Sequence, residues 1–151
     1  LRSVGLDKNH VDWSYPETFI NSEDILGTFT QGSEVVEDLA AFEQVLQYLE
    51  KINVVLEGTP FKIAYRVRDE FLIYCRYCDL ANPGSASWVN PALDQMTAMK
   101  ILSRIEGDEG KTKDVLDNLE KLMTDDFVVS KAKIKEMQVR LTKSGYTSFW
   151  A

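Results

Sequence analysis

Apolar residues recur every three or four positions over several stretches of the chain, and this spacing is typical of amphipathic helices. The strongest stretch predicts a helix over residues 34–57, with Ser33 as its N-cap and residues 58–60 (Gly-Thr-Pro) at its end. Its apolar stripe comprises Val35, Val36, Leu39, Phe42, Val45, Leu46, Leu49, Ile52 and Leu56. We expect that stripe to face the core, because the remaining positions are mostly polar.

Two further helices are predicted in the central part of the chain. One covers residues 65–80 and is apolar around most of its circumference, which is typical of a buried helix. Residues 82–85 (Asn-Pro-Gly-Ser) end it. Asn90 and Pro91 predict the start of the next helix, which should run to Gly107, because proline is favoured at the first helical position.

Two more helices are predicted in the C-terminal third. Thr112 is the expected N-cap of the first, which continues through Met123, and Ser130 is the expected N-cap of the second. Gly145 is the expected C-cap of that last helix. The tail over residues 146–150 (Tyr-Thr-Ser-Phe-Trp) is too aromatic to be loose, so we expect it to pack on the helices.

The N-terminal residues 1–33 have no helical period and form an irregular arm. Short strands are predicted within it at residues 17–20 and 25–29. Its aromatic residues are too many for a free tail: Trp13, Tyr15 and Phe19. The predicted fold class is therefore mostly α, a bundle of about five helices over residues 34–151, preceded by an irregular arm that is partly β.

The composition is that of one globular domain. Of 151 residues, 44% are hydrophobic and 27% are charged, which excludes a disordered or collagen-like chain. Seventeen basic and 24 acidic side chains give a net charge of −7, so the chain is not a nucleic-acid binder driven by bulk charge. The acidity is concentrated in residues 1–60, and we interpret it as a solvated face of the arm and the first helix.

Targeting signals and cysteine content predict a cytoplasmic setting. No run of 18 apolar residues is present, no basic-then-apolar signal peptide opens the chain, and two cysteines without a secretory signal indicate a reducing compartment. No membrane contact is expected. The first residue is Leu1 rather than methionine, and we expect the chain to be a piece of a longer protein.

Residues 107–112 (Gly-Asp-Glu-Gly-Lys-Thr) look like the end of a phosphate-binding P-loop. The full pattern requires a glycine where Ile105 stands and a strand before the loop, whereas a helix is predicted there. Asp108 and Glu109 would also repel a phosphate. We interpret the segment as a polar turn between helices.

Three other features contain residue types that can carry chemistry. Cys75 and Cys78 form a single CxxC inside a predicted helix, and we interpret them as small buried hydrophobes without a metal, because zinc needs four ligands. His10 is the only histidine, so no Ser-His-Asp or Cys-His set is visible and an independent hydrolase is disfavoured. A locally basic stretch is either the solvent face of the last helix or a contact for a phosphate or an acidic partner: Lys131, Lys133, Lys135 and Arg140.

The most informative segment is residues 63–70 (Ile-Ala-Tyr-Arg-Val-Arg-Asp-Glu). Arginine is unfavourable beside a helix N-terminus, so Arg66 and Arg68 point to a specific anion or carboxylate. If the partner is a carboxylate of this protein, Arg66 or Arg68 forms an ion pair with Asp69, with Glu70 or with the acidic first helix.

The sequence Tyr-Arg-Val-Arg-Asp-Glu at 65–70 resembles the "YRVRDE" segment of McrB-type AAA+ NTPases, the motor subunits of modification-dependent restriction systems. Residues 92–95 and 100–107 resemble the family's "ALDxQ" and "KILPKIxG", and residues 130–150 resemble its closing "S…KI…M…RL…GFTSFW". The resemblance covers about residues 40–151. Ser103 stands where the family has a proline.

The resemblance implies that residues 34–151 are the helical C-terminal lid of such an NTPase, and that residues 1–33 are an arm or a link from the upstream core. It implies that Arg66 is a sensor-2 arginine that reaches the nucleotide, with Arg68 as the fallback. The chain itself would hold no cofactor and no catalytic residue; the intact parent would use GTP or ATP with magnesium. The implied partners are the AAA+ core, neighbouring subunits of a ring and a McrC-type nuclease, without direct DNA binding by this piece.

The alternative function is a free-standing helical protein–protein interaction module. The acidic first helix or the aromatic arm would then be its docking surface. The upstream coding sequence separates the two hypotheses, because a P-loop and a Walker B motif there would support the lid.

Overall fold

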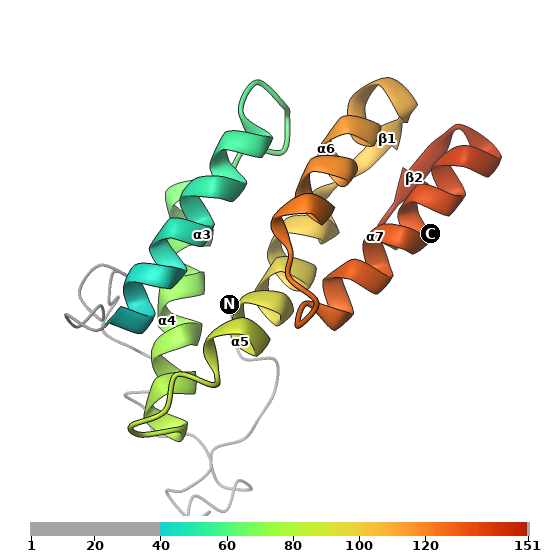
Figure 1. Ribbon diagram of the computed structural model, residues 1–151. Helices are drawn as coiled ribbons and strands as arrows, with labels where there is room; N and C mark the ends of the chain where they lie inside the picture. Colours follow the sequence, from blue (N-terminus) through green and yellow to red (C-terminus); the bar gives the residue numbers. More distant parts are fainter. Residues whose placement is uncertain (1–39, 151) are drawn as a thin grey trace, which may run out of the picture. The chain divides into compact units, whose positions relative to one another are not determined.

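The computed structural model describes residues 40–150, and these are mostly helical, as the sequence predicts. Figure 1 labels the α-helices and strands of this part of the chain. In chain order the elements are α3 (Ala40–Leu56), α4 (Tyr65–Ala81), α5 (Val89–Met96), the π-helix η1 (Thr97–Ile101), the 3₁₀ helix η2 (Leu102–Arg104), β1 (Glu106–Asp108), α6 (Glu109–Leu122), α7 (Val128–Ser144) and β2 (Tyr146–Ser148). The predicted arm over residues 1–33 and the N-cap at Ser33 lie outside the described residues.

Helix α3 buries most of the described part of the predicted apolar stripe, but Leu46 of that stripe is 37% exposed. Phe42, Val45, Ile52 and Leu56 are almost completely buried. The predicted end is also confirmed, because Gly58 adopts a left-handed φ of 74° that a side chain would disfavour. The main-chain N–H and the hydroxyl of Thr59 both donate to the carbonyl of Leu56, at 3.1 and 2.7 Å, and so satisfy one of the last free carbonyls of the helix.

Helix α4 has the predicted bounds to within one residue, but the expectation that it is buried all round is wrong. Phe71, Leu72 and Cys75 face the core, where α4 packs against α3 and α5. The opposite face is exposed: Tyr77 is 70% and Leu80 is 59% accessible. The number of apolar residues in α4 overstated its burial, because a tyrosine keeps its hydroxyl in water while its ring covers the helix surface.

The predicted single helix from Asn90 to Gly107 is interrupted. Helix α5 starts at Val89, so Pro91 is its third residue, where the missing N–H is still one of the unpaired donors of the first turn. The helix then widens into η1 and tightens into η2, and the chain leaves as strand β1. The prediction was wrong in its cap and in its end, because this segment changes its hydrogen-bond pattern twice without a sequence break.

The predicted N-caps of the last two helices are also wrong. Asp108, not Thr112, caps α6, and its carboxylate accepts a hydrogen bond from the N–H of Lys111 at 3.1 Å. Helix α7 begins after Phe127, so Ser130 lies inside its first turn. The C-cap at Gly145 is confirmed, with a left-handed φ of 71°.

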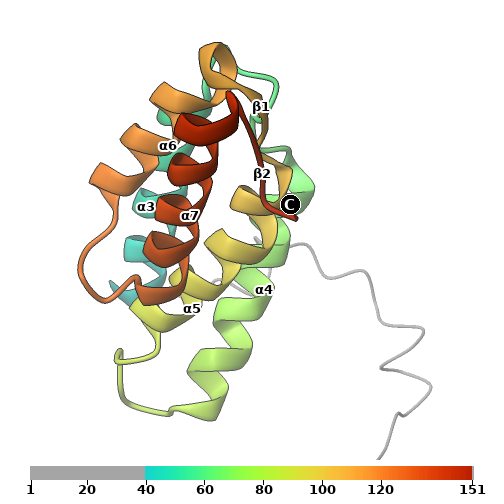
Figure 2. The same ribbon diagram turned by 90° about the vertical axis from the view of Figure 1, so that its right-hand side faces the viewer.

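The aromatic tail forms a strand and packs on the core only through Phe149, because Tyr146 and Trp150 are 50% and 78% exposed. Strands β1 and β2 are antiparallel, with Gly107 opposite Thr147. Figure 2 shows the two strands beside α7, which β2 follows directly in the chain. Strand β1 was not predicted, because a three-residue strand is too short to show a period.

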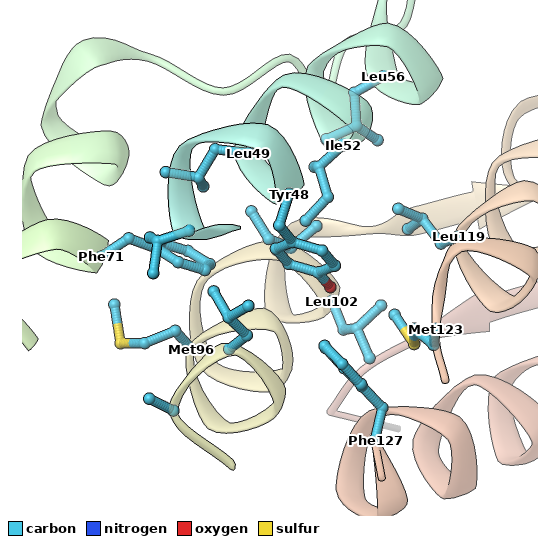
Figure 3. Close-up of a cluster of buried hydrophobic side chains, with 14 of the residues drawn as sticks. Tyr48, Leu49, Ile52, Leu56, Phe71, Met96, Leu102, Leu119, Met123 and Phe127 are labelled. Atoms are coloured by element: carbon cyan, nitrogen blue, oxygen red, sulfur yellow. The ribbon is translucent and has the colours of Figure 1, made fainter. Parts of the chain in front are cut away.

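The core lies between α3 and the segments from α4 to α7 (Figure 3). Helix α3 contacts α4, α5 and α6, and α6 contacts α7. At its centre the ring of Tyr48 lies 5.3 Å from that of Phe127, and its hydroxyl shares a 2.8 Å hydrogen bond with the hydroxyl of Thr97 in η1. Burial raises the pKa of Tyr48, so this phenol stays protonated and serves as a structural polar group.

Candidate functional site

Arg66 lies in the first turn of α4, at the surface. The preceding Ala64 has an extended backbone, makes no side-chain cap, and no acidic residue occupies the first turn. The side chain of Arg66 is 90% exposed, and its Nε donates to Oε1 of Glu70 at 3.1 Å. The structure therefore places the predicted sensor arginine in an exposed i,i+4 pair, where a carboxylate one turn away holds only one edge of the guanidinium.

Glu70 is shared between two cations. Its second oxygen, Oε2, lies 2.8 Å from Nζ of Lys100. The hydrogen bond from Lys100, followed by that from Arg66, holds the pKa of the Glu70 carboxyl below its ordinary value despite some desolvation. Glu70 is thus ionised at neutral pH. Lys100 reaches it from η1, and π-helical turns of this kind are frequent at functional sites.

These residues border a shallow surface depression of about 420 Å³. Arg66, Lys100 and Arg104 contribute three positive charges to its lining, and among the described residues Glu70 is the only acidic one that lines it. Arg104 is exposed at the end of η2. The arrangement can hold a small anion, because two forked guanidinium groups and one lysine ammonium group converge from three helical segments.

Arg68 does not line this depression. Its guanidinium lies 5.3 Å from the ring centre of Tyr65, and Nη2 donates to Oδ1 of Asp69 at 3.1 Å. The side chain is 41% exposed. Both arginines therefore have a carboxylate partner that the structural alternative named, Glu70 for Arg66 and Asp69 for Arg68, but Arg66 binds through Nε alone and keeps its terminal edge accessible.

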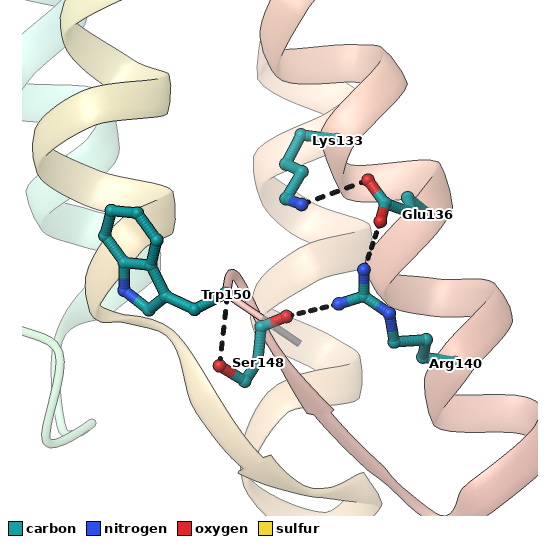
Figure 4. Close-up of polar contacts among 5 residues, drawn as sticks. All are labelled: Lys133, Glu136, Arg140, Ser148 and Trp150. Carbon is teal, nitrogen blue, oxygen red and sulfur yellow. Dashed lines mark hydrogen bonds and ion pairs between the residues drawn. The ribbon is translucent and has the colours of Figure 1, made fainter.

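The basic stretch of α7 is largely paired. Lys133 Nζ lies 3.0 Å from Oε2 of Glu136, whose Oε1 binds Arg140, as Figure 4 shows. Arg140 also donates from Nη1 to the carbonyl of Ser148 at 2.6 Å. The hydrogen bond from Lys133 is the first cause that lowers the pKa of Glu136. This network attaches the C-terminal strand to α7.

The two remaining lysines of that stretch differ. Lys131 Nζ lies 2.8 Å from Oδ1 of Asp125, in the turn before α7. Lys135 is exposed on the outer side of α7. The structure thus does not gather the four predicted residues into one cationic patch.

The P-loop-like segment has a different structure from the one predicted. Its first two residues, Gly107 and Asp108, belong to strand β1, which passes into α6 without a loop. The carboxylate of Asp108 occupies the N-terminus of α6, where a phosphate would bind, and the hydroxyl of Thr112 donates to the carbonyl of Asp108 at 2.8 Å. The segment is thus the start of a helix, and the carboxylate of Asp108 occupies the anion site at that helix end.

The CxxC cysteines are free thiols. Cys75 is fully buried, and burial raises its pKa to about 12. Cys78 is partly buried, and burial is the first cause that raises its pKa. A thiol with a raised pKa is a poor nucleophile and a poor metal ligand at neutral pH, which supports the interpretation of Cys75 as a buried hydrophobe.

Sequence reasoning named Glu70 as an alternative partner of Arg66 or Arg68, but it missed Lys100 and Arg104 as members of the site. The i,i+4 spacing of Arg66 and Glu70 was a visible signal. The contribution of Lys100 and Arg104 was not visible, because it depends on how η1 and η2 turn after α5.

Comparison with known proteins gives a family but no activity. The sequence profile of a family described as a domain of unknown function (DUF8727) matches residues 16–146, and the chain belongs to this family. No curated protein and no solved structure matches the chain. Within residues 40–150, no helix combines the length and the apolar content that a membrane span requires.

Proposed function

We propose that this chain is the C-terminal helical lid of an McrB-like AAA+ NTPase of a modification-dependent restriction system, located in the cytoplasm. In the parent protein it helps to clamp GTP or ATP with magnesium and packs against neighbouring subunits of a ring. It performs no chemistry alone. The proposal rests on the ordered sequence resemblance from residue 65 to residue 150 and on the helical architecture that accompanies it.

The single observation that carries the proposal is the placement of Arg66. A guanidinium that is 90% exposed, with only its Nε bound to Glu70, can offer its other N–H groups to a phosphate. Catalysis of phosphoryl transfer is mostly positioning and electrostatic stabilisation of the transferring group, so such a cation supplies what the reaction needs. The upstream AAA+ core supplies the phosphate cradle and the magnesium ligands, and a McrC-type nuclease is the expected partner of the ring.

The test compares Arg66→Ala with Arg68→Ala in the parent protein. Arg66→Ala should leave the melting temperature nearly unchanged, because an exposed ion pair contributes less than about 1 kcal/mol, and should slow turnover by roughly a hundredfold or more. Arg68→Ala is the matched control: it removes the pair with Asp69 and the contact with Tyr65, so it should lower stability more than turnover. If Arg66→Ala melts early while the folded protein turns over normally, the sensor assignment is wrong.

The isolated 151-residue chain should show no NTP hydrolysis above background. Turnover by the purified chain that mutations within the chain abolish would contradict the lid function.

A helical protein–protein interaction module remains the second candidate, and one observation favours it. The outer face of α4 exposes Tyr74, Tyr77 and Leu80, and aromatic residues of this kind are enriched at protein interfaces. The upstream coding sequence distinguishes the two functions: a P-loop followed by a Walker B motif supports the lid, and their absence supports the module.

A further inference from the structure

The depression beside Arg66 carries more positive charge than one sensor arginine accounts for. Arg66 comes from α4, Lys100 from η1 and Arg104 from η2, while Glu70 is the only acidic residue that residues 40–150 contribute to the lining. The cluster therefore has a formal charge of +2. Because α5 packs against α4 and leads directly into η1, the fold brings the cations together from segments more than 30 residues apart.

Glu70 pairs with two cations of this cluster but leaves other N–H groups of the cluster accessible to an anion. Its Oε1 accepts from Nε of Arg66 at 3.1 Å, and its Oε2 pairs with Nζ of Lys100 at 2.8 Å. The Nη1 and Nη2 groups of Arg66 have no hydrogen-bond partner among residues 40–150, and neither has the guanidinium of Arg104. Two of the three cations thus retain N–H groups that a ligand can use without breaking an existing bond.

We infer that this depression binds the phosphate chain of an oligophosphate through Arg66, Lys100 and Arg104, and that Glu70 is a built-in counter-ion with which the ligand competes. The binding of a phosphate chain does not depend on the proposed function. Only the identification of a nucleoside triphosphate as the source of that chain rests on the proposed function. The other residues of the range 40–150 that line the depression, which include Val67 and Met99, offer no aromatic ring for a base. The site therefore recognises phosphates and does not distinguish ATP from GTP.

The role of Glu70 has two opposed parts that an experiment can separate. It orients Arg66 and Lys100, and it repels the ligand with one full charge. In a water-exposed site at physiological salt, removal of one like charge a few ångströms from a multivalent anion is expected to tighten binding roughly threefold to tenfold. Glu70→Gln keeps the size and one hydrogen-bond acceptor, so repulsion is the main term that it changes.

The experiment titrates the 151-residue chain with inorganic tripolyphosphate at constant ionic strength, followed by calorimetry and by backbone amide chemical shifts. Lys100→Gln and Arg104→Gln should each weaken binding about threefold or more, and the shifts should cluster at the first turn of α4 and in η1 and η2. Lys135→Gln is the charge-matched control, because it removes the same charge from an exposed position on α7 outside the depression. Glu50→Gln, exposed on α3, is the matched control for Glu70→Gln.

Thermal melts of all variants establish that they are folded, and the pair that Glu70 makes with Lys100 is exposed enough for each variant to fold. The inference is overturned if Lys100→Gln and Arg104→Gln bind tripolyphosphate as Lys135→Gln does, or if Glu70→Gln binds no more tightly than Glu50→Gln. ATP and GTP should bind within about threefold of tripolyphosphate, and a preference of more than tenfold for either nucleotide would contradict a site for phosphates alone.

The two proposals fail separately. Normal turnover of Arg66→Ala in the parent overturns the lid function, whatever the isolated chain binds. Loss of turnover without tripolyphosphate binding by the isolated chain supports the lid function and overturns the preformed oligophosphate site.

Discussion

Asp94, in α5, caps the start of α7, which lies 35 residues later in the chain. It is only 4% exposed, near the end of α5. Its carboxylate oxygens accept hydrogen bonds from the N–H groups of Val129 and Ser130, at 2.9 and 2.8 Å, in the first turn of α7. The hydroxyl of Ser130 donates in turn to the carbonyl of Asp94 at 2.9 Å. The side chain of Asp94 therefore performs for α7 the task of an N-cap residue.

We predict that Asp94→Ala lowers the free energy of unfolding by about 3 kcal/mol. Loss of a helix cap costs about 1 kcal/mol, and a buried N–H left without a partner costs about 1–3 kcal/mol. For a domain of this size the loss corresponds to a fall in melting temperature of about 10 °C. Asp94→Asn keeps one acceptor oxygen and should lose about half as much.

Urea denaturation followed by circular dichroism measures the effect, with an unchanged m-value as the check that both states remain comparable. Asp114→Ala is the control, because it removes an exposed aspartate from α6 and should change stability by less than about 0.5 kcal/mol. If Asp94→Ala is no less stable than Asp114→Ala, the cap contributes nothing and the reasoning is refuted.

Three further predictions concern single groups. Iodoacetamide at pH 8 should modify Cys78 before Cys75, whose burial raises its pKa to about 12, and equal rates in the folded chain would contradict this. Tyr48→Phe should cost about 1 kcal/mol in urea denaturation, because the hydroxyl of Thr97 loses its buried partner; an unchanged midpoint would show that the bond is neutral. The pKa of Glu70 is lowered on folding, so its ionised form stabilises the protein above the ordinary value of 4.5, and this contribution is lost as the pH falls through the folded pKa. Melting temperatures of Glu70→Gln should therefore fall less steeply than those of the unaltered chain below pH 4.5, and identical profiles would contradict the shift.

The helices could be predicted from sequence because their signal is local and repeated. Helix α3 shows this best, since several turns of one apolar stripe specify both its type and its buried face. Gly58 and Gly145 ended their helices as predicted, because a left-handed backbone at a helix end favours glycine for reasons within one or two residues.

The caps of the later helices could not be predicted in this way. Ser130 is a good N-cap by residue type, but the donor groups at the start of α7 are satisfied by Asp94, which only the packing of α5 against α7 brings near. Strand β1 is likewise specified by pairing with β2, about 40 residues later. In both cases the decisive partner is distant in sequence.

The candidate site was predicted only in part, because some of its residues are likewise distant in sequence. Arg66 and Glu70 are one helical turn apart, so their pairing follows from the sequence once α4 is assigned. Lys100 and Arg104 reach the site because the chain changes from α to π to 3₁₀ geometry after α5. Nothing in the local sequence predicts that change.

A net charge of −7 and a cationic depression are compatible because charge acts over a limited distance. At physiological ionic strength the Debye length is about 8 Å, so acidic side chains beyond that distance repel an anion in the depression only weakly. Most of the negative charge belongs to residues 1–39, whereas residues 40–150 carry 15 basic and 16 acidic side chains. A long polyanion such as DNA would extend past the cluster and meet a surface of mixed charge, whereas a phosphate chain of two or three units can contact Arg66, Lys100 and Arg104 alone. The local charge therefore favours a short phosphate ligand over a nucleic acid.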